Sequence, residues 1–328
     1  MPAIGEIMNQ TRREFVRILF VASQAVVASR FLPVSLLAGT TPPAAPPNGL
    51  TFLIFGDWGR QGEQDQVEVA AQMATTSKVL DPKFIISVGD NFYEDGVQSI
   101  DDVQWQESFE DVYRDPALQL PWYCILGNHD YHANCDAQIA YGRINPRWNM
   151  PARYYLQTHR IDAVTTADFF YLDTTPMING YYRTGGEKTR DQVITQDVPK
   201  QLAWFKAALA ASTAQWKIVI GHHPIYSGGG HGDTAELIEN ILPLLNEHKV
   251  QAYFNGHDHD MQHLVAGEVN LFDTGAGSQH TLTFYTKRSK FARSCSGFTT
   301  VSLQPDKMEV QMIDNHGTVA YETSVART

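Results

Sequence analysis

The chain has 328 residues, of which 43% are apolar, and its formal net charge is −11 at pH 7. A chain of this length and composition can bury one large core or two modest ones. The negative charge, without a basic stripe, excludes nucleic acid as the main partner and means that any phosphate chemistry needs a local positive centre.

The first residues are typical of an export signal rather than of a folded domain. Paired arginines in TRREFVR, residues 11–17, precede a mostly apolar stretch at 18–28, and small residues follow near 37–40. This pattern resembles a twin-arginine signal, and the apolar stretch is shorter than the ~20 residues that span a bilayer. An amphipathic helix or a membrane anchor is the alternative interpretation. We therefore expect a signal peptide over 1–39, use of the twin-arginine export machinery, a periplasmic or secreted bacterial product, and no stable membrane span after processing.

A proline-rich tether follows the signal. The sequence TTPPAAPP at 40–47 cannot join a helix or a central strand, so we expect the tether to span 40–49. Beyond it there is no internal repeat and no further linker. The sequence therefore predicts one catalytic domain over 50–328.

Apolar runs of strand length recur along this domain, and most of them end at a polar motif. Continuous rather than alternating hydrophobicity indicates strands that are covered on both faces. Helical patterns lie between them at 64–78, 201–211 and 234–247. This alternation predicts an α/β layered domain with its ligand site at the carboxyl ends of the strands, followed by antiparallel strands at 298–303 and 308–313. The expected buried strands are 50–55, 84–88, 122–126, 169–172, 217–220, 252–254 and 270–272.

Five short motifs follow these runs, each with a glycine before its polar residues: GDWG, GDNFY, GNHD, GHHP and GHDH. The glycine lets the backbone turn sharply and approach a metal ion closely. Oxygen donors suit hard cations, and imidazole suits iron, zinc, manganese or nickel. One such motif alone is more often a turn, but five in order, each after a strand, predict a two-metal site in which Asp90 can bridge ions ~3.5–4 Å apart. The candidate ligands are Asp57, Asp90, Tyr93, Asn128, His222, His257 and His259.

These motifs and the sequence around them resemble the purple acid phosphatases, within the calcineurin-like metallophosphoesterases. Residues 95–130 follow the pattern of that family almost continuously, as do the segments DFFYLDT, QLAWFKAAL and GAGS. The resemblance is to the small single-domain type that includes tartrate-resistant acid phosphatase, and it extends from Leu50 to the C-terminal strands. It implies a four-layer αββα sandwich: two packed mixed sheets flanked by helices, with a dinuclear metal site at the strand ends.

The resemblance also implies how the ligands divide between two ions. Fe(III) is expected between Asp57, Asp90, Tyr93 and His259, and a divalent iron, zinc or manganese ion between Asp90, Asn128, His222 and His257. Tyr93 is the discriminating residue, because a phenolate is a hard anion that favours Fe(III). Most calcineurin-like relatives instead carry a histidine two residues after the first aspartate, where this chain has Gly59.

The implied activity is acid hydrolysis of phosphate monoesters by attack of a metal-activated hydroxide. His129 is the expected proton donor to the leaving group, Asp130 the residue that orients it, and His231 a second histidine on the substrate side. We expect small phosphate monoesters as substrates and a monomeric enzyme. Two alternatives stay open: a phosphodiesterase or nucleotidase with the same centre, and an iron protein that cycles between Fe(II) and Fe(III). The glycine-rich segment 227–230 and His223, where many relatives have tyrosine, leave the identity of the substrate open.

The three cysteines divide into two kinds. Cys124 lies within an apolar run, where a buried, inert thiol is expected. Cys135 and Cys295 lie in polar, loop-like sequence, so they either pair after export or remain free. The sequence leaves this open because it gives no Cα separation.

Overall fold

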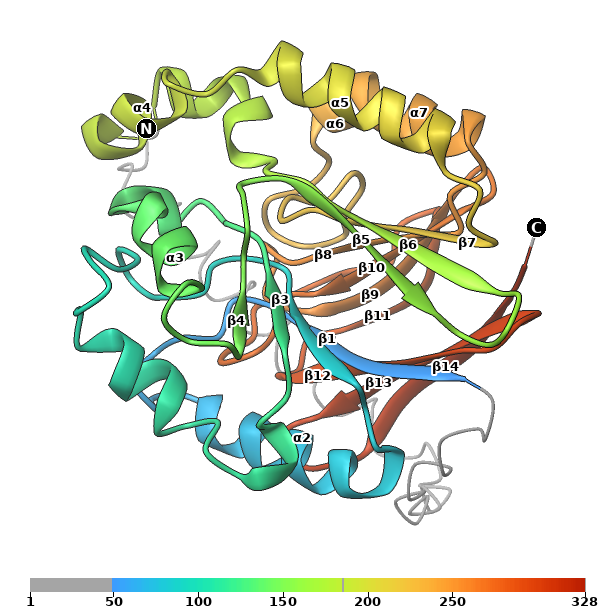
Figure 1. Ribbon diagram of the computed structural model, residues 1–328, viewed down its shortest axis with the longest axis horizontal. Coiled ribbons are helices and arrows are strands. Elements are labelled where there is room, and N and C mark those ends of the chain that lie inside the picture. The colour runs from blue at the N-terminus through green and yellow to red at the C-terminus, as the bar shows by residue number, and fades with distance from the viewer. Residues whose placement is uncertain (1–48, 185, 328) are drawn as a thin grey trace, which may run out of the picture. The chain divides into compact units, whose positions relative to one another are not determined.

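The structure is a computed structural model that describes residues 49–184 and 186–327. The predicted signal peptide (1–39) lies outside these residues, as does all of the predicted tether except Gly49. The described residues form two mixed sheets of seven strands each, packed together and flanked by helices (Figure 1). The predicted four-layer sandwich is thus confirmed. Within the described ranges, no helix is both long enough and apolar enough to cross a bilayer.

The first sheet joins the beginning of the domain to its end. Its strand order is β14 (Val319–Ala326), β13 (Lys307–Asp314), β12 (Gly297–Leu303), β1 (Leu50–Phe55), β2 (Phe84–Ser87), β3 (Trp122–Cys124) and β4 (Trp148–Asn149). Strands β1 to β4 run parallel to one another, whereas β12 pairs antiparallel with β1 and places Thr300 opposite Leu53. The carboxyl ends of β1, β2 and β3 therefore meet at one edge.

The second sheet is built from the middle of the chain. Its order is β11 (Ser289–Arg293), β9 (Met261–Ala266), β10 (Val269–Thr274), β8 (Ala252–Asn255), β7 (Trp216–Ile220), β6 (Thr166–Tyr171) and β5 (Tyr155–Arg160). Strands β6, β7, β8 and β10 are parallel, so β7 and β8 also end at a common edge.

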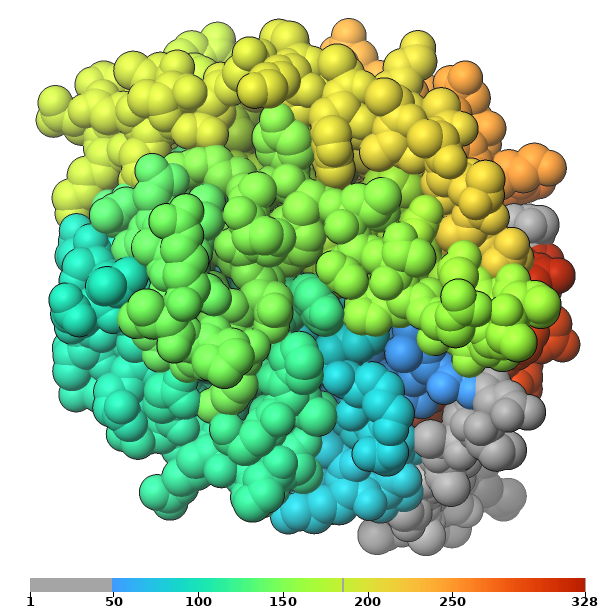
Figure 2. Space-filling view, viewed as in Figure 1, coloured from blue at the N-terminus to red at the C-terminus, as the bar shows by residue number. Residues whose placement is uncertain are grey.

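Helices cover the outer faces of both sheets. The helices α5, α6 and α7 lie along the second sheet, and α2 lies along the first (Figure 1). In the space-filling view, the green segments from α3 to β6 and the yellow α5 occupy much of the face that is shown (Figure 2). The α-helices are α2 (Gln66–Leu80), α3 (Cys135–Tyr141), α4 (Gly186–Val193), α5 (Val198–Ala211), α6 (Ala235–Asn240) and α7 (Leu242–Glu247), with a π-helix at Trp105–Glu110 and 3₁₀ turns at Pro116–Leu118, Asp130–His132, Thr175–Met177 and Asn179–Tyr182.

The continuous hydrophobic strands follow from this layering. In β1, Phe52 and Ile54 pack between the two sheets, whereas Leu53 and Phe55 pack on the helical side. In β8, Phe254 faces the space between the sheets and Tyr253 faces the outer helices. Because both faces are buried, both sets of alternate side chains are apolar.

The structure corrects two details of the sequence analysis. The single helix expected at 234–247 is divided into α6 and α7 at Ile241, because Pro243 lacks an N–H group and can only begin a new helix. The pairing left open for Cys135 and Cys295 does not form: all three cysteines of the chain are free and buried. Cys135 belongs to the cluster under α2 and Cys295 to the cluster between the sheets, so they occupy different cores.

Candidate metal centre

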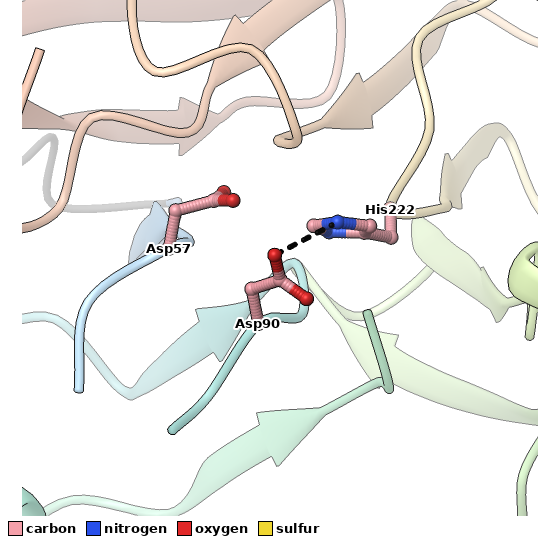
Figure 3. A group of neighbouring side chains, drawn as sticks. All are labelled: Asp57, Asp90 and His222. Carbon is pink, nitrogen blue, oxygen red and sulfur yellow. Dashed lines mark ion pairs between the residues drawn. The ribbon is translucent and has the colours of Figure 1, made fainter. Parts of the chain in front are cut away.

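The predicted ligands come together where strands of both sheets end. Asp57 follows β1 and Asp90 follows β2, whereas His222 follows β7 of the other sheet. These three side chains point toward one another (Figure 3). All three are buried, and they offer ligand atoms that lie within 4.8 Å of one another. A buried group of two carboxylates and one imidazole is a suitable site for a cation.

The backbone at this edge has room for the carboxylates only because a glycine begins each motif that packs against them. A Cβ atom on Gly127 would lie 2.1 Å from Asp90 Oδ1, and one on Gly256 would lie 2.2 Å from Asp57 Oδ2. Any other residue at either position would therefore displace a carboxylate. Asp57 and Asp90 themselves adopt positive φ angles of 59° and 48°, which turns their side chains toward the common edge.

One subset of the predicted ligands surrounds the hydroxyl group of Tyr93. This oxygen lies 3.0 Å from Asp57 Oδ1, 3.0 Å from Asp90 Oδ2 and 3.1 Å from His259 Nε2. Burial, together with the charges of Asp57 and Asp90, raises the pKa of Tyr93 well above its ordinary value. Two carboxylates around a buried phenol make a strongly negative environment, which a multiply charged cation would neutralise.

The other subset surrounds His222. Its Nε2 atom lies 3.1 Å from Asn128 Oδ1 and 3.4 Å from Asp90 Oδ2, while its Nδ1 atom donates to the Val88 carbonyl at 2.9 Å. Burial opposes the charged form of His222, but Asp90 raises its pKa to about 9. A carbonyl oxygen can only accept, so the Val88 bond keeps a proton on Nδ1 and turns Nε2, the atom that a bound cation would deprotonate, toward the site. The ring of His257 is 5.1 Å from that of His222. Burial and the neighbouring histidines His222 and His231 hold the pKa of His257 well below its ordinary value, so it is a neutral imidazole.

Asp90 belongs to both subsets. The same oxygen, Oδ2, contacts Tyr93 on one side and His222 on the other, while Oδ1 accepts a hydrogen bond of 2.7 Å from the backbone N–H of His129. Burial opposes the ionisation of Asp90, but its interactions with His222 above all, and with His129 and His257, hold its pKa well below the ordinary value. Asp90 therefore lies where it contacts the donors of both subsets.

A cavity of about 270 Å³ opens over this group. His129 and His231 both line it. The Nδ1 atom of His129 lies 2.6 Å from the carbonyl oxygen of Glu94, which can only accept, and its ring lies 4.5 Å from that of Tyr93. The free Nε2 atom of His129 is therefore the one available for proton transfer.

Asp130 does not take the position expected of it. Its buried carboxylate accepts hydrogen bonds from the backbone N–H groups of Asn91 and Gly127 and from the side chain of Gln138. No hydrogen bond joins it to His129 among the described residues, and the Glu94 carbonyl holds that ring instead. Asp130 thus organises the loops after β2 and β3 rather than a catalytic histidine.

Two residues of the site were not identified from the sequence alone. Asp258, inside the GHDH motif, lies 2.9 Å from His231 Nδ1, and this hydrogen bond raises the pKa of His231 despite its partial burial. Arg60, directly after GDWG, places its guanidinium 3.7 Å above the ring of Tyr93 and 2.8 Å from Glu94 Oε1. Asp258 lies within one of the five motifs and Arg60 directly follows another, and these positions were the only signal in the sequence.

Comparisons with known proteins agree with this geometry. The model of the calcineurin-like phosphoesterase family matches residues 50–261. The chain is 35% identical to purple acid phosphatase 7 of Arabidopsis thaliana over 85% of this chain and 86% of the relative. It is also 35% identical to tartrate-resistant acid phosphatase type 5 of Sus scrofa over 92% of this chain and 94% of the relative.

Among solved structures, the chain is similar to GAP50, described as the anchor in the inner membrane complex of Plasmodium. That similarity has a TM-score of 0.75 and 26% identity over 85% of this chain and 89% of the other. The purple acid phosphatase PPD1 from yellow lupin seeds matches with a TM-score of 0.63 and 16% identity, over 88% of this chain and 55% of the other. The latter similarity supports the fold alone.

Proposed function

Because this chain belongs to the purple acid phosphatases of the calcineurin-like phosphoesterase family, and is thereby an enzyme that hydrolyses phosphoric monoesters, we propose that it works as an exported enzyme with Fe(III) and a divalent iron, zinc or manganese ion. Asp57, Tyr93 and His259 would hold the ferric ion. Asn128, His222 and His257 would hold the divalent ion, and Asp90 would bridge the two. When bound, two such ions neutralise the charge of the phosphoryl group and activate water for attack on phosphorus.

The position of Asp90 Oδ2 is the observation that carries this proposal. It lies between the hydroxyl group of Tyr93 at 3.0 Å and the Nε2 atom of His222 at 3.4 Å. Apart from the shared Asp90, one subset has a carboxylate and a tyrosine oxygen whereas the other has only histidine and amide donors, and these sets suit ions of different hardness. The assignment of Fe(III) to the first subset therefore rests on Tyr93.

The residues above the centre would handle the substrate. His129, held at Nδ1 by the Glu94 carbonyl, would donate a proton from Nε2 to the leaving alkoxide. His231, held by Asp258, and Arg60 present positive charge to the same cavity. These charges supply the local attraction for phosphate that a chain of net charge −11 otherwise lacks.

The assignment of iron is tested by visible absorption and metal analysis of the purified enzyme. We expect a visible band from phenolate-to-Fe(III) charge transfer in the natural enzyme, and its loss in Tyr93→Phe. Phe92→Tyr in the Tyr93→Phe background is a matched control, because it restores a phenol one position away without restoring the ligand. A colourless, iron-free enzyme with full phosphatase activity would overturn the proposal.

Export by the twin-arginine route is a separate part of the proposal. It rests on the paired arginines Arg12 and Arg13, and it would let the enzyme acquire its metals in the cytoplasm before it is translocated. Replacing both arginines by lysine should leave the active enzyme in the cytoplasm, as measured by fractionation. Undiminished export of that variant would remove this route and leave the metal assignment untouched.

The same centre in a phosphodiesterase or nucleotidase is the alternative activity. Tyr93 and the acid phosphatase relatives favour monoesters, and a substrate panel of monoesters and diesters decides between the two. An iron-redox protein is the other alternative. It would keep the visible band but show no phosphatase activity at any pH.

A further inference from the structure

An exposed apolar and basic loop lies beside the catalytic cavity. The loop comprises residues 281–290, which follow β10 and include the first two residues of β11, and is called the 281–290 loop below. Within it Leu282, Phe284 and Tyr285 are 72%, 68% and 66% exposed. The other large exposed apolar residues, such as Ile144 and Val164, are scattered singly, which is normal for a protein surface.

The charge of this segment is opposite to that of the protein. Residues 281–293 contain four basic and no acidic residues, in a chain of net charge −11. Arg293 is paired with Asp314 at 3.4 Å. Among the described residues, Lys287, Arg288 and Lys290 form no ion pair, so their charges remain free for an anionic partner.

The backbone of the 281–290 loop is held in place while these side chains project. Thr281 donates its N–H to the His259 carbonyl at 2.7 Å, and Phe284 donates to the Gly228 carbonyl at 3.0 Å. Thr283 donates to Ser294 Oγ at 2.9 Å, and the Arg288 guanidinium lies 3.9 Å over the ring of Tyr226. The exposure of the three apolar residues is therefore a property of an ordered loop and does not come from loss of structure.

The 281–290 loop also borders the cavity. Gln279, two residues before the loop, lines the cavity together with His231 and His259. Gly228, which contacts Phe284, is only three residues from His231. Since a residue spans at most ~3.6 Å of chain, the backbone of Phe284 lies within about 15 Å of His231.

We propose that the 281–290 loop binds the surface of an anionic lipid bilayer. Leu282, Phe284 and Tyr285 enter the interface, and Lys287, Arg288 and Lys290 contact the headgroup phosphates. Projecting aliphatic and aromatic side chains flanked by cations are the chemistry of interfacial binding. A lipid surface, unlike a protein partner, requires no groove of matching shape. The negative charge elsewhere on the protein opposes this contact weakly, because it is screened beyond ~8 Å at physiological salt. Binding does not depend on the metal centre, and its consequence for the enzyme is that the cavity is held close to the membrane surface.

The test is sedimentation of the full chain with vesicles of phosphatidylcholine, with and without phosphatidylglycerol. We expect binding to the anionic vesicles that weakens with added salt. Leu282→Ser/Phe284→Ser/Tyr285→Ser should lower the affinity at least tenfold. Lys287→Gln/Lys290→Gln should lower it about fivefold for each lysine, on anionic vesicles only.

The matched control is Ile144→Ser/Val164→Ser/Ile194→Ser, which removes three exposed apolar residues outside the loop. It should bind vesicles as the natural chain does, and any contribution of the N-terminal residues is common to all variants. Hydrolysis of p-nitrophenyl phosphate should be unchanged in every variant, so failure here is distinguishable from failure of the proposed function. Natural protein that does not bind anionic vesicles, or loop variants that bind equally well, would overturn the proposal. The proposal would also be overturned if the loop variants lost turnover of phosphopeptides while vesicle binding stayed intact, because the loop would then bind a protein substrate and not a membrane.

Discussion

Asp258 illustrates how a single residue inside a motif supports a residue outside it. Its carboxylate accepts hydrogen bonds from the Nδ1 atom and the backbone N–H of His231, both at 2.9 Å, and another from Ser227. It is buried, whereas the His231 side chain is 56% exposed. The ring of His231 therefore depends on Asp258 for its orientation over the cavity.

We expect Asp258→Asn to lower kcat/KM for a phosphate monoester about tenfold. The reason is that a charge-assisted hydrogen bond contributes ~1.5–3 kcal/mol, and each ~1.4 kcal/mol of transition-state stabilisation is a factor of ten in rate. Steady-state kinetics measures the change, and metal analysis checks that both ions remain bound.

A double-mutant cycle distinguishes this positioning role from a general disturbance of the site. In a His231→Ala background, Asp258→Asn should have little further effect, because the ring it positions is absent. Full additivity of the two substitutions would contradict the positioning role. Ser227→Ala is a useful comparison, since it removes a different hydrogen bond to the same carboxylate.

At the scale of the elements, helix α7 depends on its surroundings for stability. It has six residues, too few for a helix to be stable in isolation. Leu245 is fully buried against the second sheet, whereas its neighbour Leu244 is only partly buried in the same cluster. The helix is thus held by the burial of one side and not by its own backbone.

Leu245→Ala should lower the free energy of unfolding by about 2–5 kcal/mol, the usual cost of such a cavity. Leu244→Ala, on the same helix, should cost clearly less because that side chain is already partly in solvent. Urea unfolding of the two variants makes the comparison. Equal losses would mean that α7 contributes through its helical propensity instead of through packing.

The elements also show what sequence reasoning could and could not predict. Strands β1, β2, β7 and β8 were predictable because both faces are buried and a glycine-containing motif ends each of them. The division between α6 and α7 was predictable in principle from Pro243, but the apolar period continues across it and conceals the break. The edge strands β5 and β11 lack a continuous apolar run, because much of each is exposed to solvent.

Contacts between distant segments were the part that a single sequence could not provide. The ligand types in the five motifs indicated a metal site, but which oxygen of Asp90 lies between the two subsets depends on how the sheets pack. The same holds for Asp130, whose neighbour in sequence is His129 but whose hydrogen bonds go to Asn91 and Gly127. Whether Cys135 and Cys295 pair could not be decided from the sequence for the same reason.

At the scale of the whole molecule, the centre draws on both sheets. The first sheet supplies Asp57, Asp90, Tyr93 and Asn128, and the second supplies His222, His257 and His259. The relative position of the sheets is fixed by the apolar cluster between them. Conditions that weaken this packing therefore disturb the centre before they disturb either sheet alone.

Acid is one such condition, and His263 makes the molecule sensitive to it. This buried residue stacks on Phe272, with 4.3 Å between ring centroids, and its two nitrogens contact the Tyr321 hydroxyl and Asn270 Oδ1. Burial lowers the pKa of His263 from 6.5 to about 4, against a partial opposing effect of the Asn270 hydrogen bond. In the unfolded chain, His263 therefore binds a proton below about pH 6.5, whereas in the folded protein it binds one only below about pH 4.

The free energy of unfolding should consequently fall as the pH falls from about 6.5 to about 4, by on the order of 2–3 kcal/mol from this residue. Urea unfolding at several pH values measures the slope. His263→Leu should be less stable at neutral pH, because the Tyr321 and Asn270 groups lose their partner, yet its stability should change less with pH across this interval. If the free energy of unfolding changed equally with pH in the natural protein and in the variant, the role assigned to His263 would be contradicted. His159 is partly buried, and burial lowers its pKa to about 4 as well. It should account for part of the slope that remains, so an enzyme suited to acid chemistry carries two histidines that favour neutral pH.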